Sequence, residues 1–489
     1  MKLRQGKTIP SGWDGPTIDT DLDIDELIRE HGSEEYDGSD DEGDYDLSDE
    51  EDNEGDSLSS YAHPLPRSSI TSPSPPPATA SSPPLAATTP FPSAAPATKS
   101  REKRKSHEKR RRKRAHMQLT KKPWELSVRP SARRKYVDFA RPIKTNLQPA
   151  SLRITRTGYT AMRDEKADKT RKRTYRLSDM VGPSSTYNFK LYEWDGVTTV
   201  PILDKKRRVI AVLAGTPDQK DWPKQHVSLA DAIEAARPHL KFAAIQTKHR
   251  RGAFPAVAVG HSYGGGQTRP MSVSQEPSNV PILHALLTHI AFIRLAGFAT
   301  GIIANWAPLL FAYYAKYCEL LSNRLPDISF NFPTTVWAAV TINFGPRTIS
   351  LRHRDYANLA WGWCPITALG RFDPDAGGHL ILWDLRLVIR FPPGSTIAIP
   401  SGLLTHSNTA IGRRETRFSV TQYTAGAIFR WVDQGYQTKE EFLAKMSPAE
   451  RAAFLVQEKR RFEEGLNMFT TLDDLRSADA DSDLSEIDE

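Results

Sequence analysis

The chain has 489 residues, of which 38% are hydrophobic, 36 are proline and only two are cysteine. This length allows one large or two ordinary domains with tails, and two cysteines exclude both a disulfide framework and a zinc site built on cysteine pairs. The net charge is +7, and no apolar run looks like a signal peptide or a membrane span, so we expect a soluble protein in a reducing compartment.

The first 180 residues change sharply in composition. Residues 1–100 are acidic and then rich in proline and serine, which predicts a disordered tail. The segment 101–180 is basic and is expected to be mostly disordered, since residues 101–122 hold 12 Lys or Arg against two Glu. Further basic runs follow at 166–176 and 205–208. Dense basic runs predict contact with DNA phosphates and a nuclear location.

Ordered structure is expected to begin between Tyr175 and Leu191. Residues 181–334 are predicted to support a catalytic core with one hairpin and three helices. The hairpin is expected at 196–213 and the helices at 228–238, with Ser228 as the cap, at 279–300 and at 305–324.

Short strands separated by turns fill residues 335–435, a pattern typical of an antiparallel barrel or jelly roll. The expected strands are VWAAVTINF, PRTISLRH, GHLILWDL, LVIRF, STIAIP and TRFSVTQYTA. Two helices, capped at Thr438 and Ser447, are predicted within 436–470, and residues 471–489 are expected to be a disordered acidic tail. Both acidic tails are expected to bind basic proteins. The predicted fold class is α+β, with a double-stranded β-helix (jelly-roll) core and supporting helices.

The chemistry-bearing residues begin with His353 and Asp355. In a strand, residues two apart point to the same face, so the imidazole and the carboxylate are expected to project together. His406 follows 51 residues later, after a turn, a strand and another turn. Two histidines and one carboxylate form the facial triad of non-haem Fe(II) oxygenases, which leaves the other metal positions open. The three are therefore the predicted catalytic metal ligands.

Arg417 and Ser419 lie 11 and 13 residues beyond His406, again two apart in a predicted strand. An arginine fork binds a carboxylate in bidentate fashion, and a serine hydroxyl adds a hydrogen bond. The pair is thus suited to a dicarboxylate cosubstrate. His379 is the rival distal ligand, but it is too close to Asp355 in sequence and has no arginine at a suitable distance behind it.

These motifs resemble the Fe(II)/2-oxoglutarate-dependent dioxygenases. Two longer strings are similar to the TET/JBP group of DNA base oxygenases in particular. His353-Arg354-Asp355-Tyr356-Ala357-Asn358 is similar to that group's His-Arg-Asp-x-x-Asn, and Arg417-Phe418-Ser419-Val420-Thr421-Gln422-Tyr423 to its Arg-x-Ser followed by an aromatic residue. The cysteine-rich zinc region of the animal enzymes is absent from the sequence, so the chain is more similar to compact fungal forms.

The resemblance implies Fe(II), 2-oxoglutarate and O₂ as cofactor and cosubstrates. It also implies that Asn358 contacts a flipped base and that Tyr423 stacks on it, although Tyr423 also fits a core aromatic of a strand. The methylcytosine oxidases have a base-reading histidine where this chain has Ala425. The expected function is oxidation of a methyl group on a DNA base, such as 5-methylcytosine or a thymine-like base. A protein or RNA oxygenase and a non-catalytic DNA-binding protein are the alternatives.

A second motif, Gly260-His261-Ser262-Tyr263-Gly264, matches the nucleophile elbow of α/β-hydrolases. Such an elbow opens a helix, whereas glycines and Pro270 follow here without a helical pattern. The sequence therefore favours a glycine-rich loop over a hydrolase site.

Overall fold

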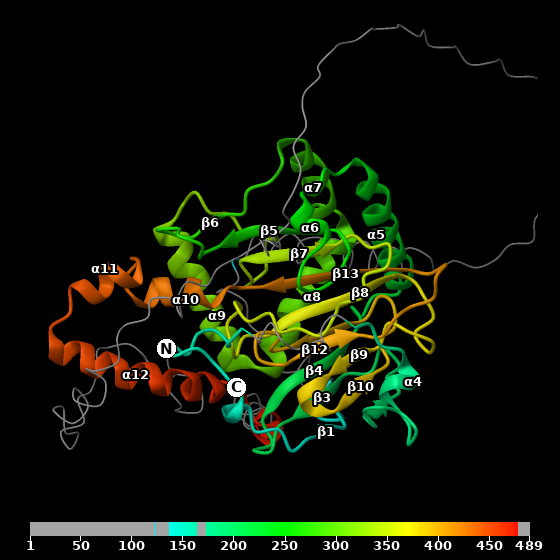
Figure 1. Cartoon of the computed structure of the whole chain (residues 1–489), viewed down its shortest axis with the longest axis horizontal. Helices are drawn as coiled ribbons and strands as arrows, with labels where there is room; N and C mark the ends of the chain where they lie inside the picture. The colour runs from blue at the N-terminus through cyan, green and yellow to red at the C-terminus, as the bar shows by residue number, and fades with distance from the viewer. Residues whose placement is uncertain (1–121, 123–135, 164–172, 478–489) are drawn as a thin grey trace, which may run out of the picture. The chain divides into compact units, whose positions relative to one another are not determined.

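The computed structural model describes residue 122 and residues 136–163 and 173–477 (Figure 1). The expectations for residues 1–100, for almost all of 101–122 and for 478–489 lie outside these ranges.

Most strands belong to one nine-stranded sheet, in the order β1-β3-β4-β11-β8-β13-β7-β5-β6. Its strands are β1 (Ile143–Lys144), β3 (Val200–Leu203), β4 (Val209–Gly215), β5 (Ala256–Ser262), β6 (Met271–Ser272), β7 (Ala339–Asn343), β8 (Cys364–Arg371), β11 (Thr396–Ile399) and β13 (Thr416–Tyr423). All the pairings are antiparallel except that of β1 with β3.

A second sheet of four strands has the order β12-β9-β10-β2. It contains β2 (Lys190–Tyr192), β9 (Leu380–Leu382), β10 (Leu387–Ile389) and β12 (His406–Asn408). From β7 to β13 the chain moves back and forth between the two sheets, and this alternation is that of a jelly roll. The predicted α+β fold with a double-stranded β-helix core is confirmed.

Helices cover the outer face of the larger sheet (Figure 1). Apolar side chains of α5, α7 and α8 pack there against β5, β7, β8 and β13. The helices are α4 (Leu177–Met180), α5 (Trp222–Ala236), α6 (Ala244–Thr247), α7 (Val280–Leu287), α8 (Ile290–Trp306), α9 (Pro308–Arg324), α10 (Gly426–Asp433), α11 (Lys439–Ala444) and α12 (Pro448–Leu466). Short 3₁₀ turns lie at Pro149–Ser151, Arg237–His239, Pro277–Asn279 and Trp383–Leu385.

Strand β13 shows how the sheet separates its two faces. Phe418 and Val420 pack into the apolar layer beneath the helices. Arg417, Ser419 and Tyr423 therefore point to the opposite face, into the roll, because side chains alternate along a strand.

Several predicted helices start or end elsewhere. The helix expected at 228–238 begins at Trp222, and Ser228 lies inside it as an exposed residue. The helix expected at 279–300 is two helices, since His289 interrupts it and its ring accepts a hydrogen bond from Ala291 N at 3.2 Å. Periodicity alone does not show such an internal cap. The helix expected at 305–324 begins at Pro308, and the capping boxes at Thr438 and Ser447 are confirmed.

The predicted start of order is wrong, because residues 136–163 are already structured. Strand β1 pairs with β3, and Tyr159 is buried with 2% of its surface exposed. The domain boundary at 334/335 is also not a structural one, since β4 and β5 are strands of the same sheet as the core.

The acidic tail was expected to begin at residue 471, but residues 472–477 are helical. Leu472 and Leu475 are buried, with exposures of 3% and 1%. The composition of residues 472–477 did not predict a helix, because this helix is stabilised by packing against the core rather than by its own sequence pattern.

The segment Gly260–Gly264 is not a nucleophile elbow. Strand β5 runs through Gly260 to Ser262 and no helix follows directly, so the hydrolase elbow is excluded, and only the residues after Ser262 lie in the expected glycine-rich loop. In the basic run 205–208, Arg208 is buried against Asp204, at 2.7 Å between Nη2 and Oδ2. Arg208 is therefore not available for the predicted DNA contact.

No single helix among the described residues is long and apolar enough to cross a membrane. Two consecutive helical segments, Pro277–Leu287 and Ile290–Trp306, are long and apolar enough only when taken together, and the chain bends sharply between them.

Candidate metal centre

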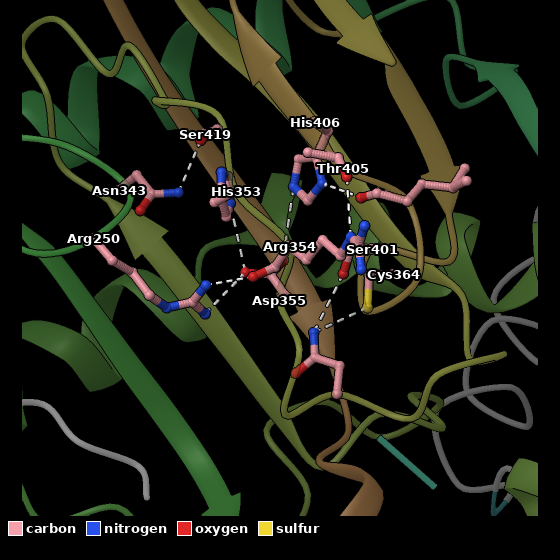
Figure 2. Close-up of polar contacts among 12 residues, drawn as sticks. Arg250, Asn343, His353, Arg354, Asp355, Cys364, Ser401, Thr405, His406 and Ser419 are labelled. Atoms are coloured by element: carbon pink, nitrogen blue, oxygen red, sulfur yellow. Dashed lines mark hydrogen bonds and ion pairs between the residues drawn. The ribbon is translucent and has the colours of Figure 1, made fainter. Parts of the chain in front are cut away.

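His353 and His406 face each other across an antiparallel bridge between two neighbouring segments. Each backbone amide donates to the other residue's carbonyl, at 3.0 Å from His353 N and 2.9 Å from His406 N. The two imidazole centroids are 4.2 Å apart. With Asp355, the two histidines present ligand atoms that all lie within 4.8 Å of one another (Figure 2). The predicted triad is thus assembled and can hold a metal ion.

A turn, and not the predicted strand, positions Asp355 at the site. Residues 346–353 do not form a regular strand, and they pair only through bridges at Arg347 and His353. Asp355 lies beyond the bridge, where its backbone amide donates to Ser401 O at 3.0 Å. The shared direction of His353 and Asp355 therefore depends on this anchored turn and not on strand alternation.

Hydrogen bonds orient both histidine rings for metal binding. His353 Nδ1 lies 2.7 Å from Leu351 O, and His406 Nδ1 lies 2.9 Å from Leu404 O. A carbonyl only accepts, so Nδ1 carries the proton in each neutral ring and Nε2 keeps its lone pair for a metal. Burial, followed by the proximity of His353, lowers the pKa of His406 to about 4, which keeps this ring neutral at physiological pH.

Asp355 is held as a carboxylate by the groups around it. Its Oδ1 lies 3.5 Å from His353 Nε2 and 3.6 Å from Arg250 Nη2, and its Oδ2 lies 3.8 Å from His406 Nε2. Burial by itself would raise the pKa of Asp355, but both histidines and Arg250 outweigh it and hold the pKa well below its ordinary value. Figure 2 shows His353 and Arg250 both directed at this carboxylate.

Arg417 is buried inside the roll with 1% of its surface exposed. Its Nη1 donates to Thr348 O at 3.0 Å, while Nε has no hydrogen-bond partner among the described residues. Burial lowers its pKa to about 10, so it stays charged at neutral pH without a carboxylate partner in the described part of the chain. A buried unpaired guanidinium is costly, and an anionic ligand would offset that cost.

Ser419 lies on the same face and accepts a hydrogen bond from Asn343 Nδ2 at 2.9 Å (Figure 2). This contact orients the hydroxyl group, which keeps its own proton available for donation. Arg417 and Ser419 thus both point into the roll from β13, and both carry donors that could hold a carboxylate.

His379, the rival ligand, is not part of the triad. It is buried, and its Nδ1 lies 3.1 Å from Thr409 Oγ1. Burial lowers its pKa to about 4. The ring is therefore a neutral side chain of the interior.

Asn358 and Tyr423 lie close to the triad. The backbone of Asn358 bridges to Ala425, and its Nδ2 donates to Ser401 Oγ at 3.3 Å. Tyr423 is half-buried, and burial raises its pKa despite the neighbouring Thr341 and Arg251. Ala425 is buried and precedes α10. The turn after Asp355 and the end of β13 therefore form one wall beside the metal site.

Arg250 and Ser401 are site residues that sequence reasoning did not identify. Arg250 precedes Asp355 by 105 residues, and Ser401 follows it by 46. Neither belongs to a motif, and only the basic run at 248–251 signals Arg250. Their roles arise from folding, which brings both to the turn that carries Asp355.

No family model matches this chain, and no curated protein matches it either. Among solved structures, it is similar to NgTET1 in complex with 5mC DNA, with 13% identity, coverage of 49% of this chain and 83% of that chain, and a TM-score of 0.35. It is also similar to an oxidoreductase of the 2OG-Fe(II) oxygenase family from Burkholderia pseudomallei, with 18% identity, coverage of 40% and 77%, and a TM-score of 0.24.

Proposed function

We propose that this chain is an Fe(II)/2-oxoglutarate-dependent dioxygenase. The observation that carries the proposal is the combination of two features inside one jelly roll. One is a triad whose two imidazoles are fixed with Nε2 available to a metal. The other is a buried arginine without a counter-ion among the described residues. A facial triad of this composition is diagnostic of non-haem Fe(II) oxygenases.

Fe(II) with 2-oxoglutarate and O₂ supplies the oxidation of an unactivated C–H bond, coupled to decarboxylation of the cosubstrate to succinate. His353, Asp355 and His406 would hold the metal on one face and leave the other face open. Arg417 would bind the distal carboxylate of the cosubstrate as a fork, and Ser419 would donate to it. The buried walls of the roll would exclude water from the reacting atoms.

We further propose that the substrate is a methylated base in DNA. A flipped base needs an aromatic plane to stack on and a polar group that reads its edge, and Tyr423 and Asn358 are suited to these roles. Because Nδ2 of Asn358 already contacts Ser401, its Oδ1 would do the reading, as an acceptor for an exocyclic amino group. The basic run 101–122 supports DNA contact and a nuclear location.

The test is succinate release by the full chain, loaded with Fe(II) without oxygen and then assayed with and without methylated DNA. We expect DNA to stimulate turnover and His353→Ala to abolish it. His379→Gln is the matched control, since it replaces a buried histidine outside the triad. If folded, iron-loaded protein makes no succinate under any condition, the enzyme proposal is wrong. Stimulation by methylated RNA or peptide but not by DNA would contradict the substrate alone.

A further inference from the structure

Arg250 and Arg251 lie at the edge of the metal centre, in the turn before β5. The carbonyl of Arg251 accepts a hydrogen bond from Leu351 N at 2.8 Å, which ties the turn to the segment leading to His353. The guanidinium of Arg250 contacts Asp355, donates to Arg354 O and lies 4.8 Å from the ring centroid of Tyr356. Arg250 is thus already engaged by the protein.

The guanidinium of Arg251 differs from that of Arg250: among the described residues it makes no hydrogen bond or close ion pair, and its electrostatic neighbours are Asp355, Arg250 and Tyr423. It is half-buried, and it lies within electrostatic range of Asp355 and Tyr423. Once a metal neutralises Asp355, the charge of Arg251 would be still less compensated. A partly desolvated cation of this kind costs free energy unless an anion pairs with it.

Two more arginines stand on the loop that carries the metal ligands. Arg354 donates from Nε to Thr405 Oγ1 at 3.0 Å, directly beside His406. Arg352 lies 4.5 Å from the ring centroid of Trp383 and is within electrostatic range of Arg354. The acid that faces Arg354 is Asp384, whose Oδ2 accepts from Thr405 N at 2.6 Å. Positive charge therefore accumulates around the metal centre.

A single carboxylate does not explain this accumulation, because Arg417 inside the roll already suits the carboxylate of the cosubstrate. A chain of phosphates does explain it, since each phosphate can take one guanidinium. We propose that Arg250, Arg251, Arg352 and Arg354, the arginine rim, bind the sugar–phosphate backbone of a nucleic acid. Arg251 contacts one phosphate next to the nucleotide whose base stacks on Tyr423. The assignment rests on the proposed function, because Tyr423 receives the base.

The test is equilibrium binding of the full chain to a fluorescent oligonucleotide, single-stranded and duplex, over a series of salt concentrations. Arg251→Gln is compared with Lys224→Gln, which removes the same charge from an exposed position on α5. We expect Arg251→Gln to weaken binding about tenfold at low salt and to reduce the salt slope by about 1. Arg251→Lys should keep the slope, and Lys224→Gln should resemble the unchanged protein.

Thermal unfolding distinguishes binding from structure. Removing an unpaired half-buried cation should leave the Tm unchanged or higher, whereas loss of a structural contact would lower it. Unchanged binding and an unchanged salt slope in Arg251→Gln, on both forms of nucleic acid, would overturn the proposed phosphate contact; succinate release by the unchanged protein tests the proposed enzyme separately. If Arg251→Gln weakens binding but even the unchanged protein releases no succinate, the phosphate contact is supported and only the proposed enzymatic activity is contradicted.

Discussion

At the scale of single residues, the metal site is prepared before any ligand arrives. Each histidine donates Nδ1–H to the carbonyl two residues before it. Both rings therefore already have the tautomer in which Nε2 can bind a metal. Arg250 and the two histidines keep Asp355 ionised. Preorganisation of this kind raises metal affinity, because the ordering cost is met during folding.

Asp355→Asn should weaken binding of Co(II), a spectroscopic substitute for Fe(II), by at least about tenfold, since the variant loses an anionic ligand. Isothermal titration or the visible absorption of bound Co(II) measures this. His379→Gln is the control and should keep the affinity of the unchanged protein. Equal affinity in Asp355→Asn would remove Asp355 from the ligand set.

Arg417→Met should raise the KM for 2-oxoglutarate by about a hundredfold, the cost of losing a buried charge-assisted pair of about 3 kcal/mol. The Tm of the variant should not fall, because the substitution replaces an unpaired buried cation with an apolar chain of similar length. Arg371→Met, at an exposed ion pair with Asp231, should leave the KM unchanged. A lower Tm with a normal KM would instead mark Arg417 as structural.

At the scale of elements, close packing outweighs helix propensity at one position in α12. Gly465 lies in α12, where alanine is normally preferred by about 1 kcal/mol. A Cβ at this position would overlap the indole ring of Trp361, which is 1% exposed. The glycine therefore allows α12 to approach the segment between the metal ligands and β8.

Gly465→Ala should lower the stability by about 1–3 kcal/mol, because overpacking outweighs the gain in helix propensity. Gly301→Ala in α8 is the matched control, since a Cβ there meets no atom within 4 Å. The control should be neutral or more stable. Denaturant unfolding of both variants measures the difference, and a stabilised Gly465→Ala would show that α12 does not pack as described.

At the scale of the whole molecule, apolar packing connects the helices to the sheets. Side chains of α8 and α9 pack with strands of both sheets, and those of α5 and α7 pack on the larger sheet. We therefore expect the metal to stabilise a structure that already exists, rather than to create it.

Protein treated with a chelator should keep its near-UV circular dichroism, and added Co(II) should raise its Tm. At about 100 times the dissociation constant, binding stabilises the folded state by about 2.7 kcal/mol. The Asp355→Asn variant should show almost no such increase. Loss of tertiary structure on chelation would instead make the site part of the folding core.

The sequence by itself determined the features that reside in short motifs. His353 and Asp355 are close in any conformation because they are two residues apart. Arg417 and Ser419 share one face of their strand because side chains alternate along it. The caps at Thr438 and Ser447 act on the helices that directly follow them. The alternation of short strands was enough to predict the jelly roll. None of the expected strands covers β8 (Cys364–Arg371), although this strand lies at the centre of the larger sheet, between β11 and β13.

Tertiary structure alone decided what depends on contacts between distant residues. It brought Arg250 to Asp355 across 105 residues and anchored that turn on Ser401. It also placed β4 and β5 in the same sheet as the core, and it gave Leu472 and Leu475 a buried position. A pattern in the sequence reports only the preferences of neighbouring residues. These contacts form because burial and hydrogen bonding across the fold outweigh those local preferences.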